Sequence, residues 1–189
     1  MKRLLLIVIA VMFVVSYSFA AVLNSGISLG LGTVSDSDLS KVYGSGFVIN
    51  PYLGVEISDV FFIGLGYESG YKKEGDVGIY KENATLKISG FQLFAEYRIK
   101  VKKFAPFLKL GYGSYTVKNS FKMESLKKYA FSKRSSGVIL GGGLRLPLSD
   151  SFSFTGELDY LILKVKPFDR NVNIGGIRVL VGLTINFNI

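Results

Sequence analysis

Glu157 and Asp159 are the residues of this sequence whose type and spacing come closest to a catalytic pattern. They are two positions apart, so in a strand they share one face and lie close enough to share a proton. Two such carboxyl groups act as acid and base in glycoside hydrolysis when they line an open cleft. The chain has no histidine, the most common general base, and no cysteine for a thiolate metal site or a disulfide.

The same polar face carries other charged side chains of both signs. Five acids and four bases recur at alternating positions along the chain. In a space too small to hydrate each charge separately, such groups must pair. We therefore predict an internal ion-pair network that plugs the interior, rather than an acid–base pair in a cleft. Its members are Glu56, Glu68, Glu96, Arg98, Lys109, Arg145, Glu157, Asp159 and Arg178.

The stretch Ile88–Ile99 shows which element positions these side chains. Its residues divide into two alternating sets, so a period of two fits and a helical period of 3.6 does not. The apolar set is Phe91, Leu93, Ala95, Tyr97 and Ile99; the polar set is Gly90, Gln92, Glu96 and Arg98, with Phe94 as its exception. The stretch is about as long as a bilayer-spanning strand, roughly nine to eleven residues.

Eight segments share this alternation and predict eight strands. After residue 20 no run is apolar over the roughly eighteen residues that a membrane helix needs, so any membrane span must be made of strands. An even number of strands lets a barrel close with both termini on one side. The predicted strands are Gly26–Ser35, Gly46–Ile57, Val60–Tyr71, Leu86–Lys100, Phe104–Val117, Ser136–Leu148, Ser151–Leu163 and Asn173–Phe187.

Short and long connections alternate between these segments. The short turns lie around Ser58-Asp59, Val101-Lys-Lys103 and Ser149-Asp150. The long connections lie around Asp36-Ser-Asp38, Lys72–Thr85, Lys118–Arg134 and Lys164–Val172. Outer-membrane barrels place short turns toward the periplasm and long loops outside the cell. Asp36-Ser-Asp38 lacks the other ligands and the glycine of a calcium loop, so we predict a solvated loop there and no metal site.

The polar face is also rich in glycine, with Gly-x-Gly pairs at residues 30/32, 64/66, 111/113 and 141/143. An eight-stranded barrel is just wide enough for side chains to fill, so glycines make room beside larger neighbours. A soluble lipocalin-type barrel would turn its apolar face inward and would need many Lys and Glu residues on every strand. The small polar face and bulky apolar face instead favour lipid outside. Aromatic residues Tyr67, Tyr97, Tyr112, Tyr160 and Phe187 are candidates for membrane-interface girdles.

The first twenty residues predict an export signal. Lys2 and Arg3 precede an apolar run from Leu4 to Val15, and the small residues Ser18 and Ala20 suit cleavage before Ala21. The alternative is an uncleaved anchor helix. Residues 21–189 then form one domain with 21 basic and 14 acidic residues, a net charge of +7 that favours anionic surfaces. Nucleic acid is not expected as a partner of an exported chain.

The connection Lys118–Arg134 is the most informative outward feature. Its basic side chains outnumber its single acid, Glu124, and aromatic and apolar residues lie between them. Such a segment could bind outer-leaflet phosphates, an anionic polysaccharide or a partner surface, or could simply coexist with an anionic envelope. The candidate ligand-binding residues are Lys118, Lys122, Lys127, Lys128, Lys133 and Arg134.

The sequence resembles the small eight-stranded outer-membrane β-barrel proteins, such as the transmembrane domain of outer membrane protein A and outer membrane protein X. The resemblance rests on the signal, the eight alternating segments, the order of turns and loops, and the last strand from Ile177 to Ile189. The resemblance implies an all-β, antiparallel, up-and-down transmembrane barrel in the bacterial cell outer membrane. It also implies outer-membrane lipid as surroundings and assembly by the barrel-assembly machinery, which reads a terminal aromatic residue. Here Phe187 lies two positions before Ile189.

The resemblance also weighs against catalysis, because outer-membrane barrel enzymes need a histidine as base or orienter and this chain has none. We expect no enzymatic activity and no cofactor. The main hypothesis is a structural, envelope-stabilising barrel with a plugged lumen that binds anionic partners through its basic loop. The alternatives are a narrow porin-like pore and a soluble periplasmic carrier of an apolar ligand.

Overall fold

The computed structural model describes residues 22–77, 82–99, 101, 103–121, 129–166 and 172–188. The predicted export signal, residues 1–20, therefore lies outside the described residues. One short helix, α2 (Ser37–Tyr43), and nine strands make up the fold of the described part. The strands are β1 (Val22–Gly32), β2 (Gly46–Glu56), β3 (Phe61–Val77), β4 (Glu82–Arg98), β5 (Ala105–Phe121), β6 (Tyr129–Pro147), β7 (Phe152–Val165), β8 (Val172–Asn173) and β9 (Ile177–Asn188).

Eight of these strands form a closed antiparallel barrel, which confirms the predicted fold. The sheet runs in the order β6-β5-β4-β3-β2-β1-β9-β7, and pairing of β6 with β7 closes the ring. The two-residue strand β8 pairs only with the end of β7; Val172 was expected in a loop and Asn173 at the start of the last strand, which begins at Ile177 instead. Every neighbour pair is antiparallel, as an up-and-down barrel requires.

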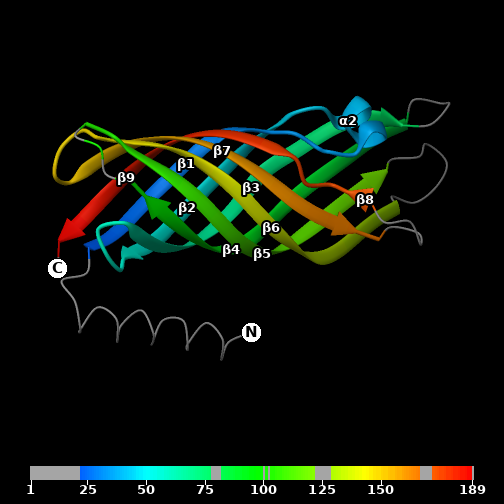
Figure 1. Ribbon diagram of the computed structural model, residues 1–189. Helices are drawn as coiled ribbons and strands as arrows, with labels where there is room; N and C mark the ends of the chain where they lie inside the picture. The colour runs from blue at the N-terminus through cyan, green and yellow to red at the C-terminus, as the bar shows by residue number, and fades with distance from the viewer. Residues whose placement is uncertain are drawn as a thin grey trace.

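The barrel has two ends with different connections (Figure 1). Three short turns, between β2 and β3, β4 and β5, and β6 and β7, lie at the end where β1 begins and β9 finishes. This is called the turn end. Helix α2 and strand β8 lie at the opposite end, called the loop end. Among the described residues, the chain has no helix of the length and apolarity that a bilayer crossing requires.

The alternation of side chains places apolar groups outside and polar groups inside. On β5, Leu108 is 67% exposed, whereas the side chain of the next residue, Lys109, is 1% exposed. The outer faces of β1, β2, β4 and β9 likewise expose Leu, Ile, Val and Phe side chains. A soluble carrier barrel has apolar side chains inside and polar side chains outside. The barrel of this protein has the opposite arrangement. The five aromatic residues predicted for the interface girdles all face outward.

Glycines make room for rings inside the barrel, as the sequence predicted. A Cβ atom built at Gly64 would lie 2.5 Å from Cζ of Phe94, and one built at Gly143 would lie 2.8 Å from Cζ of Phe107. Alanine at either position would therefore collide with a buried ring. The interior has no spare space at these positions.

Two of the predicted long loops are mostly strand. Strands β3 and β4 remain paired from Tyr71↔Ile88 to Val77↔Glu82, and β5 and β6 remain paired up to Phe121↔Tyr129. The sequence prediction was wrong here because charged residues such as Lys72 and Lys118 were taken for loop. They are the solvent-side positions of strands whose inner positions, including Leu86 and Val117, are buried.

The segment Asp36-Ser-Asp38 was expected to be a solvated loop and instead starts α2. The Asp36 side chain accepts hydrogen bonds from the backbone N–H groups of Asp38 and Leu39, at 3.1 and 3.2 Å. Aspartate is one of the preferred N-cap residues because it satisfies N–H groups that have no partner inside the helix. The acidic residues at this segment therefore have a structural role at the helix start.

Candidate functional site: the barrel interior

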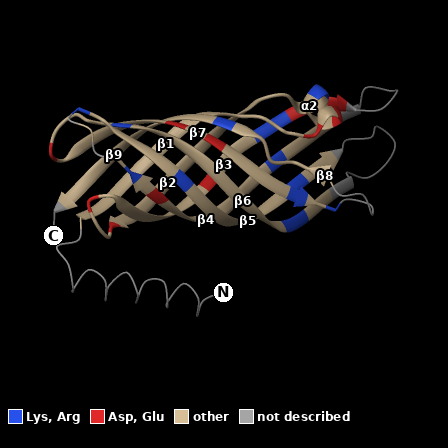
Figure 2. Ribbon diagram, in the orientation of Figure 1, with Lys and Arg blue, Asp and Glu red and all other residues tan. Residues whose placement is uncertain are grey.

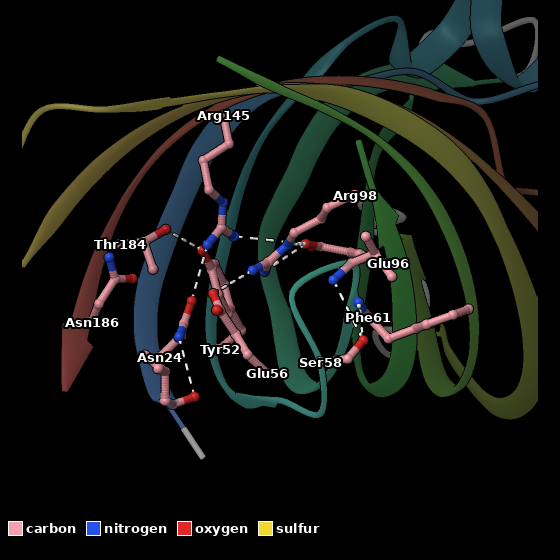
Figure 3. Close-up of polar contacts among 12 residues, drawn as sticks. Asn24, Tyr52, Glu56, Ser58, Phe61, Glu96, Arg98, Arg145, Thr184 and Asn186 are labelled. Carbon is pink, nitrogen blue, oxygen red and sulfur yellow. Dashed lines mark hydrogen bonds and ion pairs between the residues drawn. The ribbon is translucent and has the colours of Figure 1, made fainter. Parts of the chain in front are cut away.

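The first group of charges lies near the turn end and joins β1, β2, β4 and β6 (Figure 3). Arg98 donates from Nη1 to Oε1 of Glu56 at 2.6 Å and from Nε to Oε2 of Glu96 at 2.9 Å. Arg145 donates to Oδ1 of Asn24 at 3.0 Å and lies 3.7 Å from the Glu96 carboxylate. Two guanidinium groups and two carboxylates thus balance one another, with Glu96 shared between both arginines.

Aromatic rings support this group. Tyr52, Phe62 and Phe94 pack together, with ring centroids 5.9 to 6.4 Å apart. The Arg98 guanidinium lies 4.2 Å from the centroid of Phe62, a cation–π distance. The Tyr52 and Thr184 hydroxyl groups are 2.5 Å apart, which links β2 to β9. Phe94, the apolar exception on the polar face of its strand, therefore has a place in a ring cluster.

The second group is centred on Lys109 and contains the two carboxyl groups with catalytic spacing. The Lys109 ammonium donates to Glu157 and, at 2.9 Å, to Oδ2 of Asp159. It also lies 4.7 Å from the ring centroid of Phe94. All three charged side chains are buried. One cation therefore holds both carboxylates, and no open cleft separates them.

The third group lies closer to the loop end. Arg178 on β9 donates to Oε1 of Glu68 on β3 at 2.6 Å, and both side chains are buried. The Tyr115 hydroxyl donates to Oε1 of Gln92 at 3.1 Å. The Arg178–Glu68 bond crosses the interior between strands that are not neighbours in the sheet. It ties together two parts of the wall that β1 and β2 separate.

All nine charged residues predicted for the lumen thus point inward and lie within ion-pair distance of a residue of opposite charge. Removing charges from water costs several kcal/mol per ion, so burial of these groups is tolerable only because each has a partner. The arrangement can hold the walls together and fill space. It holds Glu157 and Asp159, the pair with catalytic spacing, against one buried ammonium group.

Sequence reasoning missed a second part of the interior, an apolar core at the loop end. On β7 the inward residues Glu157 and Asp159 are followed by Leu161, Leu163 and Val165, all buried. The inner face of β4 changes in the same way, and α2 packs its residues Leu39 and Val42 against this core. The buried members are Val34, Tyr43, Val48, Tyr71, Ala84, Leu86, Ile88, Tyr115, Val117, Ile139, Leu161, Leu163, Val165, Ile174 and Leu180.

Two tyrosines connect α2, which forms a cap over the apolar core, to the barrel. Tyr43 at the end of α2 donates from its hydroxyl to Oδ1 of Asn119 on β5 at 3.2 Å. Burial raises the pKa of the Tyr43 phenol above its usual value, and the Asn119 bond opposes that shift. Tyr71 donates to the backbone oxygen of Gly44 at 3.1 Å. The helix is therefore anchored over the loop end of the interior.

A cavity of about 530 Å³ opens at the turn end. Arg98, Arg145 and Glu56 form its charged floor, and Asp59 and Asp150 lie in its lining close to the short turns. The cavity stops at the ion-paired groups that hold the two arginines. It is a recess in one end of the barrel.

The predicted basic loop is divided by the structure. Lys118 belongs to β5, and Lys133 and Arg134 belong to β6, where all three are exposed. Lys118 and Arg134 lie on the outer face of the sheet, whereas Lys133 lies opposite Val117 on the inner-face positions. Lys122, Lys127 and Lys128 lie outside the described residues. Of the three described residues, the structure therefore places two on the outer face and one on the inner-face positions.

A closed eight-stranded barrel with a charged interior and an apolar exterior defines an integral membrane β-barrel. The sequence model of the outer membrane protein beta-barrel domain matches residues 6–187 of the chain. The chain belongs to this family, and its place is the bacterial outer membrane. No curated protein sequence matches the chain.

Solved structures share the fold at low sequence identity. Ail, the attachment invasion locus protein of Yersinia pestis in complex with the heparin analogue sucrose octasulfate, is 14% identical with a TM-score of 0.62, over 89% of this chain and 100% of that one. Neisserial surface protein A is 15% identical with a TM-score of 0.59, over the same shares. A major outer membrane protein from Thermus thermophilus is 14% identical with a TM-score of 0.60, also over 89% and 100%.

Proposed function

We propose that this protein is a closed scaffold of the outer membrane, which stabilises the envelope without conducting solutes. The observation that carries the proposal is the set of interior bonds between strands that are not neighbours: Arg145 of β6 to Asn24 of β1, Lys109 of β5 to Asp159 of β7, and Arg178 of β9 to Glu68 of β3. A pore would need these bonds to break. Removing one partner of a buried ion pair costs about 3 to 5 kcal/mol, because the other charge is left uncompensated.

Planar-bilayer recording tests the closed lumen. The purified protein, with its folded state checked by heat-dependent gel migration, is added to a planar bilayer. A porin of known conductance, added to a separate bilayer under the same conditions, gives current steps as the control. The closed scaffold should give no current steps. Repeated steps of uniform size would overturn the proposal in favour of a narrow pore.

The same contacts support a role without catalysis. Glu157 and Asp159 accept hydrogen bonds from one buried ammonium group, so neither is poised opposite a substrate. A glycosidase-type pair needs a water or a sugar between its carboxyl groups. Replacing Glu157 by Gln should leave any hydrolytic activity of the purified protein unchanged while lowering its stability.

Assembly through the barrel-assembly machinery is also part of the proposal. Phe187 lies near the end of β9 and is 46% exposed on the outer face, where a partner can contact it. Replacing Phe187 by Ala should lower the fraction of newly made protein that shows heat-dependent gel migration in outer-membrane preparations. An unchanged fraction would argue against reading of this aromatic residue.

A second candidate function is binding of an anionic polysaccharide or lipid head group by the basic segment 118–134. Its support is the exposure of Lys118 and Lys133, together with the heparin analogue bound by the similarly folded Ail. Reversing charge at Lys127 and Lys128 to Glu should weaken retention on an immobilised polysulfated polysaccharide. The same reversal at Lys103 and Lys166 is the matched control. Equal retention of both variants would remove this function.

A further inference from the structure

Three lysines form a straight row across the outer face of three adjacent strands. Lys72 of β3 lies directly opposite Lys87 of β4, and Lys87 lies directly opposite Lys118 of β5. All three are exposed. Residues directly opposite in antiparallel strands have Cβ atoms about 5 Å apart, and like charges in such pairs are destabilising. This lysine row therefore stores repulsion in the isolated chain.

A bulge in β3 sets this alignment. The register between β3 and β4 shifts between Glu68 and Tyr71, and Gly70 between them has a φ of +92°, which favours glycine. Without the extra residue, Lys72 would share the inner face with Glu68, because both numbers have the same parity. With it, Tyr71 is buried inside and Lys72 lies outside. The backbone thus turns a third lysine toward the row.

The row follows the edge of the apolar belt. Passing along the outer face toward the loop end, the order is Tyr67, Ser69, Lys72 on β3 and Phe91, Ser89, Lys87 on β4. On β5 it is Tyr112, Ser114, Thr116, Lys118. Aromatic residues mark the membrane interface, and hydroxyl groups and cations beyond them lie at the level of lipid head groups. The ring centroids of Tyr67 and Phe91 are 4.7 Å apart, so the aromatic residues are in contact below Lys72 and Lys87.

Exposed basic residues lie along part of the barrel wall at the loop end. Figure 2 shows basic residues gathered toward the α2 end of the strands. Beyond the lysine row, the outer positions there include Arg134 on β6 and Lys164 on β7, whereas they are Thr33 beside β1, Phe47 on β2 and Ile177 on β9. The lysine row differs from Arg134 and Lys164 because its three members lie directly opposite one another on adjacent strands.

Neighbouring charges leave the row cationic. Lys72 makes an ion pair with Glu74 at 3.5 Å, but both side chains are more than half exposed, and such pairs contribute little. Among the described residues, no carboxylate lies within ion-pair distance of Lys87 or Lys118. Arg134 is the diagonal neighbour of Lys118, since Thr116 pairs with Arg134 and Lys118 with Ser132. The patch therefore carries more positive than negative charge.

We propose that the row Lys72–Lys87–Lys118 binds the phosphate groups of an outer-leaflet lipid whose chains lie against the belt of β3, β4 and β5. Three ammonium groups in about 10 Å, at the spacing of adjacent strands, match one head group that carries more than one phosphate. The apolar belt directly beneath them accommodates the acyl chains. This site rests on the outer-membrane location of the barrel and is independent of the closed lumen and of the segment 122–128.

Lipid titration followed by native mass spectrometry tests the site. The probe is a diphosphorylated lipid A, compared with the same lipid after dephosphorylation. The variant is Lys72→Ser, Lys87→Ser and Lys118→Ser combined, and the control replaces the exposed Lys41, Lys103 and Lys166 by Ser, which changes the net charge equally. Each lysine near an anionic membrane surface contributes about fivefold, so the row variant should bind roughly a hundredfold more weakly than the control.

Lipid-dependent stability gives a second readout with opposite signs. In a zwitterionic detergent, the row variant should have a urea midpoint equal to or above that of the wild type, because repulsion between the lysines is removed. In the diphosphorylated lipid its midpoint should be below that of the wild type. The combined Lys→Arg variant keeps the charge and should retain lipid binding.

Three results would overturn the assignment. Equal binding by the row and control variants would show that the lysines are not the site. Equal binding of the phosphorylated and dephosphorylated lipid would exclude phosphate recognition. Displacement of the lipid by an equal concentration of inorganic phosphate would make the site one for free phosphate and not for a lipid. None of these results bears on the conductance test of the closed scaffold.

Discussion

The interior of this barrel has two sections that fill similar space with opposite chemistry. Toward the turn end, guanidinium, ammonium and carboxylate groups pair around a cluster of rings. Toward the loop end, Leu, Val, Ile and Tyr side chains form a core that resembles the inside of a soluble protein, covered by α2. The polar section lies behind the apolar belt. On β3, β4 and β5 the apolar section lies behind exposed lysines, whereas on β7 and β9 the apolar belt continues outside it.

This contrast follows from the two solvents. Where lipid covers the outer face, that face must be apolar. The polar residues that alternate with it along each strand therefore face the interior and need partners there. Where water covers the outer face, the strands can follow the usual rule of polar outside and apolar inside. The proposed closed lumen then has two independent supports, ion pairing in one section and hydrophobic packing in the other. Loss of one should leave the other as a seal.

The largest expected effect is that of Lys109→Ala in the polar section. The substitution leaves Glu157 and Asp159 buried beside each other without a cation, which should lower the free energy of unfolding by about 4 kcal/mol. The urea midpoint of the refolded barrel measures this loss. Acidification neutralises the two carboxylates and should recover part of it. Lys103→Ala, in a short turn, is the control; equal midpoints for the two variants would contradict the role of the pair.

In the apolar section, Leu161→Ala should cost about 3 kcal/mol because it leaves a cavity among packed side chains. This loss should not change with acidification, since no charged group is uncovered. The same urea titration at two pH values separates the two variants. A pH-dependent loss of stability for Leu161→Ala would contradict the assignment of Leu161 to a section without charged groups.

A smaller effect is expected for helix α2, which covers the apolar section. Asp36→Ala removes the acceptor for the N–H groups of Asp38 and Leu39, and loss of an N-cap costs about 1 kcal/mol. Amide hydrogen exchange over residues 37–43 should become faster while exchange in β5 and β7 stays slow. Asp38→Ala, which keeps the cap acceptor, is the matched control. Faster exchange throughout the barrel would mean that the cap supports more than the loop end.

The smallest expected effect is the pH dependence of Tyr43. Because burial raises the pKa of its phenol above the usual value near 10, the folded state favours the neutral form. Its contribution is complete below pH 10 and is lost as the pH rises through the folded pKa. Tyr43→Phe should remove this alkaline dependence and lose the bond to Asn119, about 1 kcal/mol at neutral pH. An identical alkaline profile for both proteins would exclude Tyr43 as its source.

The polar section and the barrel itself were predictable from sequence. A period of two, interrupted at regular intervals by turn residues, defines strands and faces, and Glu56, Arg98 and Lys109 lie on the face that it assigns to the interior. Which acid pairs with which base was not predictable. Pairs such as Glu68 with Arg178 depend on the stagger of strands that are far apart in the sequence.

The loop end was less accessible to sequence reasoning. Leu161 and Leu163 alternate with Tyr160 and Ile162, so both faces of β7 are apolar there and the pattern does not say which is inside. The bulge at Gly70 changes which residues of β3 face outward, and a fixed period of two places Lys72 wrongly. Charges on hairpin arms were interpreted as loops because their buried partners, such as Leu86, are only two or three per strand.

Planar-bilayer recording of a barrel that lacks the Lys109 group, one of the three charged groups of the polar section, tests the central claim most directly. The variant replaces Lys109, Glu157 and Asp159 together by Ala, which removes the charged group without leaving an unpaired charge. Heat-dependent gel migration confirms that it is folded. Two independent seals predict no current steps, because the apolar section with its α2 cap still closes the loop end. Repeated steps from this variant, with none from the wild type, would show that the ion pairs alone close the lumen.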